Sequence, residues 1–411
     1  MRKILKNILF CLMPLIILFA LVEGGLHLSG FQGNRFYSIL FGDDRNSPML
    51  FQESPRLWWK LFPNTQVSFL GIETRTDEYG MRIHPSTPVV ANKGPRILCL
   101  GDSSTFGWRM DYEDTYPYLL EKALQDSLPG VQVFNGGVPG YTSHQNLHQF
   151  MQLVDQVEPD YVILYTGNND VSLAGSNDLQ KFKEAESLIG VQEFFNHFLS
   201  YQYLKQKLVP VKPFKMLGVL SLEEVLKKPV RVGLPEFTDN LNQFLEVANK
   251  KGIPAFIIIA PSNPGAPYLL EIPNGTGKVN ELVSSAGKFL KESNYNEVKK
   301  VIVRLKELAP DYYRTKFIEG QLLKRQGQKG WLPLFEEALE LHPFPSRLKK
   351  AYIQSMIDLG KKMQAPVINA NEAFKKSPIG LDKLMIDGIH PSKEGNRIIS
   401  RNVVKAMEKN L

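Results

Sequence analysis

The chain has 411 residues, of which 43% are hydrophobic and 22% are charged, a balance that excludes a chain disordered throughout. Its formal net charge of +7 is not gathered into a basic run, so we expect no nucleic acid partner. The two cysteines, Cys11 and Cys99, exclude a disulfide framework and argue against a paired-cysteine metal site.

Residues 1–30 are predicted to target the chain to a membrane. Ile8 to Val22 carries no charge, follows three basic residues and precedes Glu23. Counted back to Ile4, the segment has nineteen residues, near the lower limit of the roughly 17 to 25 residues that span a bilayer. The flanking charges would leave the rest of the chain on the outer (periplasmic or extracellular) side. We therefore expect an uncleaved N-terminal membrane anchor. The alternative is a signal peptide whose cleavage releases a secreted protein, although residues 23–26 fit a cleavage site poorly.

Residues 31–95 are rich in turn formers and aromatic side chains, and we expect them to wrap the core or to link it to the anchor. From residue 96 onward, short apolar runs alternate with longer segments whose apolar residues recur every three or four positions. The predicted strands lie at 96–100, 132–134, 161–165, 255–260 and 366–369. The predicted helices include 118–128, 143–157 and 237–251.

The continuous apolar character of these strands indicates a sheet that is covered on both faces. Strands and helices in alternation predict an α/β fold with a doubly wound parallel sheet over residues 96–411, whose ligands bind at the carboxyl ends of the strands. Two insertions interrupt this domain. Residues 171–235 form a Lys-rich predicted lid or rim, and residues 277–345 form a predicted helical hairpin. The second insertion has a tetratricopeptide-like alternative, because Pro310 and Pro343 end similar segments near the period of about 34 residues.

The first predicted strand ends in Gly101-Asp102-Ser103, just before a helical pattern. A serine at such a turn exposes its hydroxyl above the sheet, and the helix start supplies backbone N–H groups. These features suit a nucleophile, but a phosphate cradle would use them as well. The nucleotide-binding motifs fail, because no G-x-G-x-x-G follows the strand and residues 275–278 lack the rest of a Walker loop. We expect neither a cofactor nor a metal.

A hydroxyl nucleophile needs a base, and His390 is the strongest candidate among the seven histidines. It follows Asp387 by three positions in a loop before the C-terminal helix, whereas the other six have no acidic partner in a suggestive local setting. In such a loop Asp387 can fix the imidazole tautomer, which leaves the second ring nitrogen free to accept the serine proton.

Two further loops follow strands that neighbour the first one. Residues 135–142 include Gly140, and residues 167–170 include Asn169. Backbone N–H groups and an asparagine amide, without lysine or metal, suit an oxyanion hole, in which one donor lowers the barrier by about 3 kcal/mol. Trp108 and Tyr141 lie beside these loops in sequence, and either residue could stack on a sugar or belong to the core.

Four blocks in this order resemble the SGNH hydrolase family, also called GDSL-type esterases and lipases. They are Gly101-Asp102-Ser103, Gly140 in N-x-x-x-x-G-x-T, Gly167-Asn168-Asn169-Asp170, and Asp387-x-x-His390. The resemblance implies a flavodoxin-like sandwich with strand order 2-1-3-4-5. It also implies Ser103 as nucleophile, His390 as general base and acid, and Asp387 as its orienter. The implied oxyanion donors are the Ser103 N–H, the Gly140 N–H and the Asn169 side chain.

Two details qualify the resemblance. Residues 59–64 and 77–82 also resemble the region before the first strand in membrane-anchored bacterial members. Ser104-Thr105 stand where the best-known lipases have leucine, which speaks against lipase activity but not against the catalytic residues.

The sequence thus predicts a serine esterase or acyl transferase of the cell envelope that cleaves small acyl esters, plausibly acetyl groups on carbohydrate, through an acyl-enzyme. Residues 277–345 are a predicted docking site for a protein partner. Two alternatives stay open at this point. The domain could be a non-catalytic envelope component that binds glycan, or Ser104 could be the attacking hydroxyl.

Overall fold

The computed structural model describes residues 2–31, 33, 50–86, 94–208, 222–274 and 276–410. Its centre is an eight-stranded sheet with strand order β10-β9-β8-β6-β7-β5-β4-β3. The strands of this sheet are β3 (Gln66–Phe69), β4 (Ile72–Thr76), β5 (Arg82–Ile83), β6 (Arg96–Gly101), β7 (Gln132–Gly137), β8 (Tyr161–Thr166), β9 (Ala255–Ile259) and β10 (Val367–Asn369). A separate hairpin consists of β1 (Phe51–Ser54) and β2 (Trp58–Leu61).

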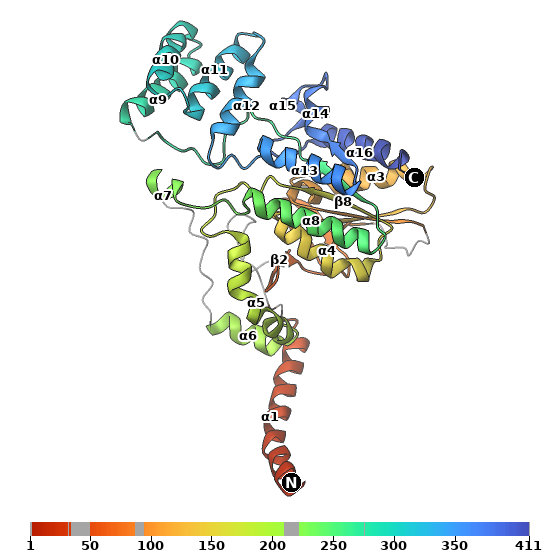
Figure 1. Ribbon diagram of the computed structural model, residues 1–411. Coiled ribbons are helices and arrows are strands. Elements are labelled where there is room, and N and C mark those ends of the chain that lie inside the picture. The colour runs from red at the N-terminus through yellow and green to blue at the C-terminus, as the bar shows by residue number, and fades with distance from the viewer. Residues whose placement is uncertain are drawn as a thin grey trace.

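Helices cover both faces of the sheet (Figure 1). The helices of the α/β core are α2 (Ser103–Phe106), α3 (Tyr116–Leu124), α4 (Ser143–Val157), α8 (Leu234–Lys250), α13 (Lys350–Met363), α14 (Ala370–Lys375), α15 (Leu381–Leu384) and α16 (Lys393–Glu408), with a 3-10 turn at Tyr112–Asp114. Helices α3 and α16 pack together on one face, and α4, α8 and α13 pack on the other. The residues of β6 from Ile97 onward are therefore buried from both sides, which explains their continuous apolar run.

The five strands predicted from the apolar runs are confirmed as β6 to β10. They pair in parallel, with β6 between β7 and β8, so their spatial order is the expected 2-1-3-4-5. The predicted parallel sheet is confirmed for these five strands, but the sheet as a whole is mixed. Strands β5, β4 and β3 extend the sheet in the antiparallel sense beyond β7, where Arg82 pairs with Asn135. Residues before the first parallel strand thus cover an edge that β7 would otherwise expose.

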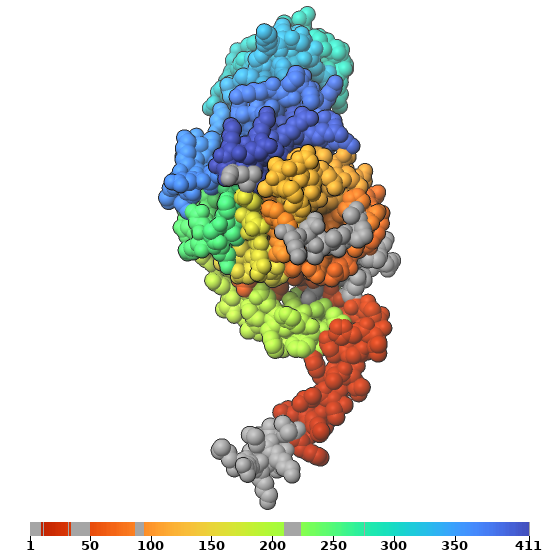
Figure 2. All heavy atoms as spheres, turned by 90° about the vertical axis from the view of Figure 1, so that its right-hand side faces the viewer, coloured from red at the N-terminus to blue at the C-terminus, as the bar shows by residue number. Residues whose placement is uncertain are grey.

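The amino-terminal helix α1 (Arg2–Leu28) projects from the body of the molecule (Figure 1, Figure 2). Its upper end packs on α6 (Leu199–Leu208), where the Phe19 and Phe198 rings meet at a centroid distance of 5.4 Å. Among the described residues, no helix is long and apolar enough to cross a membrane. The expected membrane anchor is therefore without support in the structure.

The first predicted insertion contains α5 (Asp178–Phe195), α6 and α7 (Leu222–Leu226). Glu23 of α1 accepts hydrogen bonds from the backbone N–H groups of Leu199 and Ser200, at 2.7 and 2.9 Å, and so caps the start of α6. These contacts tie the insertion to α1. The role of the segment as a lid or rim stays a prediction.

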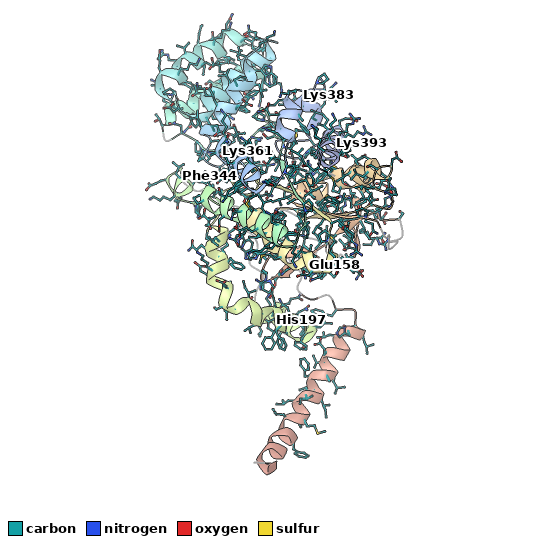
Figure 3. The ribbon with its side chains drawn as sticks, turned by 45° about the vertical axis from the view of Figure 1, so that its right-hand side comes forward. Glu158, His197, Phe344, Lys361, Lys383 and Lys393 are labelled. Atoms are coloured by element: carbon teal, nitrogen blue, oxygen red, sulfur yellow. The ribbon has the colours of Figure 1, made fainter. Side chains whose placement is uncertain are left out.

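The second predicted insertion, residues 277–345, is called the helical module below. It contains α9 (Gly277–Lys291), α10 (Tyr295–Leu308), α11 (Tyr313–Arg325) and α12 (Trp331–Leu341), which stand apart from the sheet in Figure 1. Helices α9, α10 and α11 share an apolar cluster of their own. A second cluster joins the module to the α/β core through Tyr268 after β9, and it includes Phe344, which lies near α7 (Figure 3).

Candidate active site

The turn between β6 and α2 presents Ser103 at the carboxyl edge of the sheet. Asp102 caps α2, because its Oδ1 accepts a hydrogen bond from the Ser104 N–H at 2.8 Å. Burial raises the pKa of Asp102 to about 6. Gly101 is required here, since a Cβ would lie 2.2 Å from Thr105 Oγ1 and 2.5 Å from the Tyr165 carbonyl oxygen. The tight strand-to-helix turn therefore depends on Gly101 and Asp102, the two residues that precede the serine.

Three predicted site residues meet at this edge. Ser103 Oγ lies 2.8 Å from His390 Nε2, and His390 Nδ1 lies 2.7 Å from Asp387 Oδ2. Asp387 Oδ1 also accepts hydrogen bonds from the backbone N–H groups of Ile389 and His390, at 2.8 and 2.9 Å. Burial raises the pKa of Asp387, but the hydrogen bonds and the attraction of His390 outweigh this effect and lower it to about 2. The carboxylate is thus ionised at neutral pH and faces the imidazole.

Ser104 does not share this contact. Its hydroxyl donates to the Ile389 carbonyl oxygen at 3.4 Å, whereas His390 faces Ser103. The geometry accordingly favours Ser103 over Ser104 as the attacking hydroxyl.

The two aromatic residues beside the site differ in their surroundings. Trp108 is partly exposed, and its ring stacks on that of His390 with a centroid distance of 5.5 Å and an interplanar angle of 18°. Tyr141 is fully buried, and its hydroxyl donates to the Trp59 carbonyl oxygen at 2.6 Å. Of the two alternatives for Tyr141, sugar stacking or a place in the core, the burial of the ring supports the core.

The loops that follow β7 and β8 adjoin the Ser103 turn, since both strands pair with β6. Asn169 Nδ2 donates a hydrogen bond to the Tyr141 carbonyl oxygen at 2.9 Å, which ties its amide to the loop that carries Gly140. An amide nitrogen carries two hydrogens, so one hydrogen bond does not use up its capacity to donate. Gly140 adopts a φ of 83°, a left-handed conformation that glycine accepts without strain. The structure thus brings both predicted donor loops to one edge.

A buried carboxylate fixes one of these loops. Asp170 Oδ1 accepts a hydrogen bond from the Ser143 N–H at the start of α4, at a distance of 3.0 Å, and it also accepts one from the Ser143 hydroxyl. Burial raises the pKa of Asp170 to about 7, against the lowering effect of these hydrogen bonds. Asp170, the neighbour of Asn169 in the Gly167–Asp170 block, therefore connects this loop to the start of α4.

Sequence reasoning missed residues that brace the site from a distance. Arg82 of β5 is buried, and its guanidinium donates to the carbonyl oxygens of Phe106, Gly107 and Met110, at 2.8 to 3.0 Å. It thereby holds the chain that follows α2. Arg82 lies in residues 31–95, which were predicted to wrap or link the core, and no sequence motif there indicated this role.

Three histidines away from the site have distinct surroundings. His84 Nε2 lies 2.6 Å from Glu113 Oε1, an acidic partner that is 29 positions away in the sequence. Burial lowers the pKa values of His144 and His148, whose rings pack on each other and on Phe182. Among the described residues, no group of three or more His, Cys, Asp or Glu side chains could hold a metal ion.

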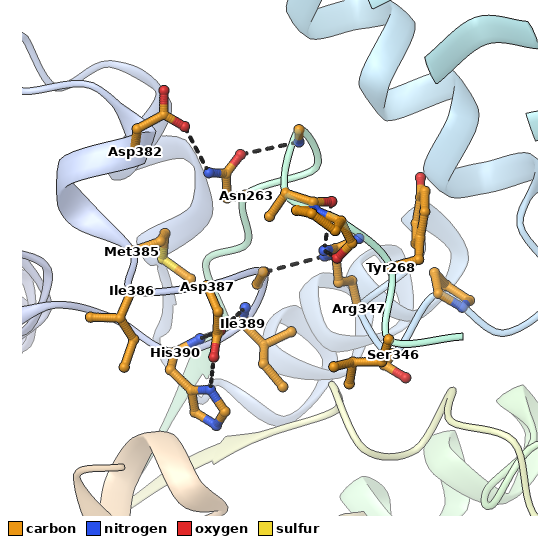
Figure 4. Close-up of a pocket in the computed structure, with 16 residues that line it drawn as sticks. Asn263, Tyr268, Ser346, Arg347, Asp382, Met385, Ile386, Asp387, Ile389 and His390 are labelled. Atoms are coloured by element: carbon orange, nitrogen blue, oxygen red, sulfur yellow. Dashed lines mark hydrogen bonds and ion pairs between the residues drawn. The ribbon is translucent and has the colours of Figure 1, made fainter. Parts of the chain in front are cut away.

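A cavity of about 560 Å³ lies beside the 387–390 loop (Figure 4). Its lining includes His390 and Asp387 from that loop, Tyr268 from the segment after β9, and Arg347 from the segment after the helical module. This wall is assembled from distant parts of the chain, so no sequence motif could mark it.

An α/β sheet with a hydrogen-bonded serine, histidine and aspartate at its carboxyl edge is the arrangement of a serine hydrolase. The model of the GDSL-like lipase/acylhydrolase family matches residues 99–398, and the chain belongs to this family.

Individual relatives match more narrowly. An arylesterase of Vibrio mimicus is 40% identical over 75 residues, which cover 18% of this chain and 38% of the relative. Thioesterase 1/protease 1/lysophospholipase L1 of Escherichia coli is 35% identical over 74 residues, 18% of this chain and 34% of that protein. The chain thus spans little more than a third of the length of these relatives. Among solved structures, a lipase/acylhydrolase from Enterococcus faecalis has a TM-score of 0.39 at 15% identity, over 77% of this chain and 97% of that chain.

Proposed function

We propose that this protein is a serine esterase or acyl transferase in which Ser103 attacks the carbonyl carbon of a small acyl ester. One observation carries the proposal: the hydrogen-bonded series from Ser103 Oγ through His390 to Asp387, with distances of 2.8 and 2.7 Å. A hydroxyl is a poor nucleophile by itself, and a base within hydrogen-bond reach activates it. The narrow overlap with characterised relatives leaves the activity to be tested directly.

The proposed reaction follows from the position of His390. Nε2 takes the Ser103 proton as Oγ bonds to the carbonyl carbon, and the carbonyl oxygen becomes an oxyanion. The same Nε2–H then protonates the leaving alcohol oxygen, the carbon–oxygen bond breaks, and an acyl-enzyme results. Water or a second hydroxyl releases the acyl group by the reverse proton transfers. Asp387 stays ionised throughout, which its low pKa supports, and it stabilises the imidazolium.

We infer that the oxyanion is stabilised by the Ser103 N–H at the start of α2, the Gly140 N–H and the Asn169 Nδ2. The hydrogen bond from Asn169 to the Tyr141 carbonyl oxygen supports this assignment, because it fixes the amide beside Gly140. A donor that is already oriented needs little reorganisation when charge develops.

We further propose an acetyl ester on a carbohydrate as the substrate class, with a short acyl group and a polar alcohol. Partly exposed Trp108 beside His390 supports a sugar-sized ligand, since it offers indole surface at the site. The charge pattern around α1 and its exposed apolar side chains, among them Phe10, Leu15 and Leu21, support an enzyme that works on the outer side of a membrane. Fractionation of cells that express the full chain tests this location.

Hydrolysis of p-nitrophenyl acetate tests the catalytic assignment. We expect Ser103→Ala to lower kcat by a factor on the order of 10⁴ or more. Ser104→Ala is the matched control, because Ser104 contacts the Ile389 carbonyl oxygen and not His390. It should keep activity within about tenfold of the wild type. An active Ser103→Ala variant would overturn the proposed function.

A further inference from the structure

The cavity beside the 387–390 loop lies on the histidine side of the site. Residues of three segments line it, and Figure 4 shows Asp387 and His390 at one end and Tyr268 and Arg347 at the other. Gly140 and Asn169 are not among its lining residues. In a serine esterase the general acid protonates the leaving oxygen, so the alcohol portion of the ester must lie on the side of the histidine. The position of the cavity therefore suits the alcohol portion.

Arg347, which lines this cavity, is a buried charged residue whose hydrogen bonds go to backbone groups. It is 2% exposed, and its Nε and Nη2 donate to backbone carbonyl oxygens only, those of Gly388, Ala266 and Pro267, at 2.8 to 3.3 Å. The guanidinium lies 4.8 Å from the centroid of the Tyr268 ring. Among the described residues, Arg347 Nη1 has no hydrogen-bond partner, and neither has the Tyr268 hydroxyl. A buried donor without a partner is costly, so an acceptor oxygen would be favourable here.

The hydrogen bonds of Arg347 reach no carboxylate of the cavity, although the negative charge of Asp387 partly offsets the lowering of the Arg347 pKa by burial. Asp387 is bound to His390 at 2.7 Å, and Asp382 is bound to Lys324 at 2.6 Å and to Asn263 at 3.1 Å. Each negative charge thus has its own partner, while Arg347 has carbonyl oxygens and an aromatic face. A buried guanidinium gains from a directly hydrogen-bonded carboxylate, whose two oxygens match its planar fork.

We propose that this cavity is the subsite for the alcohol portion of the ester and that Arg347 selects alcohols that carry a carboxylate. The inference rests on the proposed esterase function and narrows its substrate class to esters whose alcohol portion carries a carboxylate. Arg347 acts here as a specificity-determining residue, and its contact with the Gly388 carbonyl oxygen also links it to the 387–390 loop.

A pair of matched esters tests the preference. 4-Carboxyphenyl acetate and 4-(methoxycarbonyl)phenyl acetate differ in charge while presenting the same acyl group. We expect the wild-type protein to favour the carboxylate ester by about 10- to 100-fold in kcat/KM, the range of a charge-assisted hydrogen bond. Arg347→Gln should reduce this ratio to about one, and Arg347→Lys should retain part of it. Because the ratio is taken within one variant, any general loss from the altered 387–390 loop cancels.

Two controls keep the outcomes apart. Lys383→Gln removes a positive charge on α15 (Figure 3) that does not line the cavity, and it should leave the ratio unchanged. Equal hydrolysis of both esters by the wild-type protein would overturn the subsite while the esterase function stands. Hydrolysis of neither ester would count against the proposed function. Calorimetric binding of 4-hydroxybenzoate to Ser103→Ala then decides the subsite separately: binding that Arg347→Gln weakens about tenfold supports it, and binding no tighter than that of the methyl ester overturns it.

Discussion

Asp387 holds His390 in place through both oxygens of its carboxylate. One oxygen contacts His390 Nδ1, and the other accepts two backbone N–H groups of the same loop. These contacts fix the tautomer in which Nε2 can accept the Ser103 proton. At the scale of single residues, the proposed chemistry therefore depends on one carboxylate that must be ionised and correctly oriented.

Asp387→Asn should lower kcat/KM for p-nitrophenyl acetate by roughly 10³- to 10⁴-fold, because an amide can stabilise the wrong imidazole tautomer and carries no charge. The matched control is Asp155→Asn, which removes an exposed carboxylate that pairs with Lys251. This control should keep full activity. An Asp387→Asn variant within tenfold of the wild type would contradict the assigned role.

The residues of the site could be predicted from the sequence because each stands in a short block. Ser103 and His390 are 287 positions apart, yet parallel strands bring their ends to one edge of the sheet. The burial of Tyr141 could not be predicted in this way. It depends on β2, because the Trp59 carbonyl oxygen accepts a hydrogen bond from the Tyr141 hydroxyl. The two residues are 82 positions apart in the sequence. Arg347 and Tyr268 were missed for the same reason, since only tertiary packing places them in the cavity that His390 also lines.

At the scale of elements, Asp170 links the loop after β8 to the start of α4 through Ser143. Its pKa of about 7 lies above the ordinary value of 3.8, so the folded state holds the proton more tightly than the unfolded chain. This contribution to stability is complete below about pH 4 and is lost as the pH rises toward 7.

Asp170→Asn should remove this pH dependence, because an amide does not titrate. We expect the Tm of the variant minus that of the wild type to increase from pH 5 to pH 8, as measured by thermal unfolding in matched buffers. Asp160→Asn, a substitution near the opposite end of β8, serves as the control. A Tm difference that stays constant over this range would rule out the titration of Asp170.

The strands of the parallel part of the sheet could be predicted from their apolar residues, whereas the antiparallel strands β3, β4 and β5 could not. Strands β6, β8 and β9 are apolar runs that are almost entirely buried, which makes them visible in the sequence. Strands β3, β4 and β5 are short and carry polar residues. They belong to the sheet because β5 pairs with the edge of β7, β4 pairs with β5, and β3 pairs with β4. The bracing contacts of Arg82 depend on that pairing, so neither feature had a local signal.

On the scale of the whole molecule, the α/β core carries the site, α1 projects from one end and the helical module stands at another (Figure 1). The module contributes to the site indirectly, since Lys324 of α11 binds Asp382 and the segment after α12 supplies Arg347. The domain boundaries and a protein partner for the module remain predictions.

Deletion of residues 2–30 should leave catalysis intact. Helix α1 packs on α6, through Phe19 and Glu23, and lies away from the 387–390 loop. We expect kcat/KM for p-nitrophenyl acetate within about twofold of the full chain. A loss of more than tenfold, with the shortened protein still folded by circular dichroism, would show that α1 supports the active site.

The most direct test of the central claim is to map the site of covalent modification by a fluorophosphonate in the full chain. The reagent phosphonylates a serine hydroxyl that an adjacent base activates, and mass spectrometry of the digested protein locates the adduct. The account predicts an adduct on Ser103 that is absent from Ser103→Ala and greatly slowed in Asp387→Asn. An adduct on Ser104, or an unmodified Ser103 in folded protein, would contradict it.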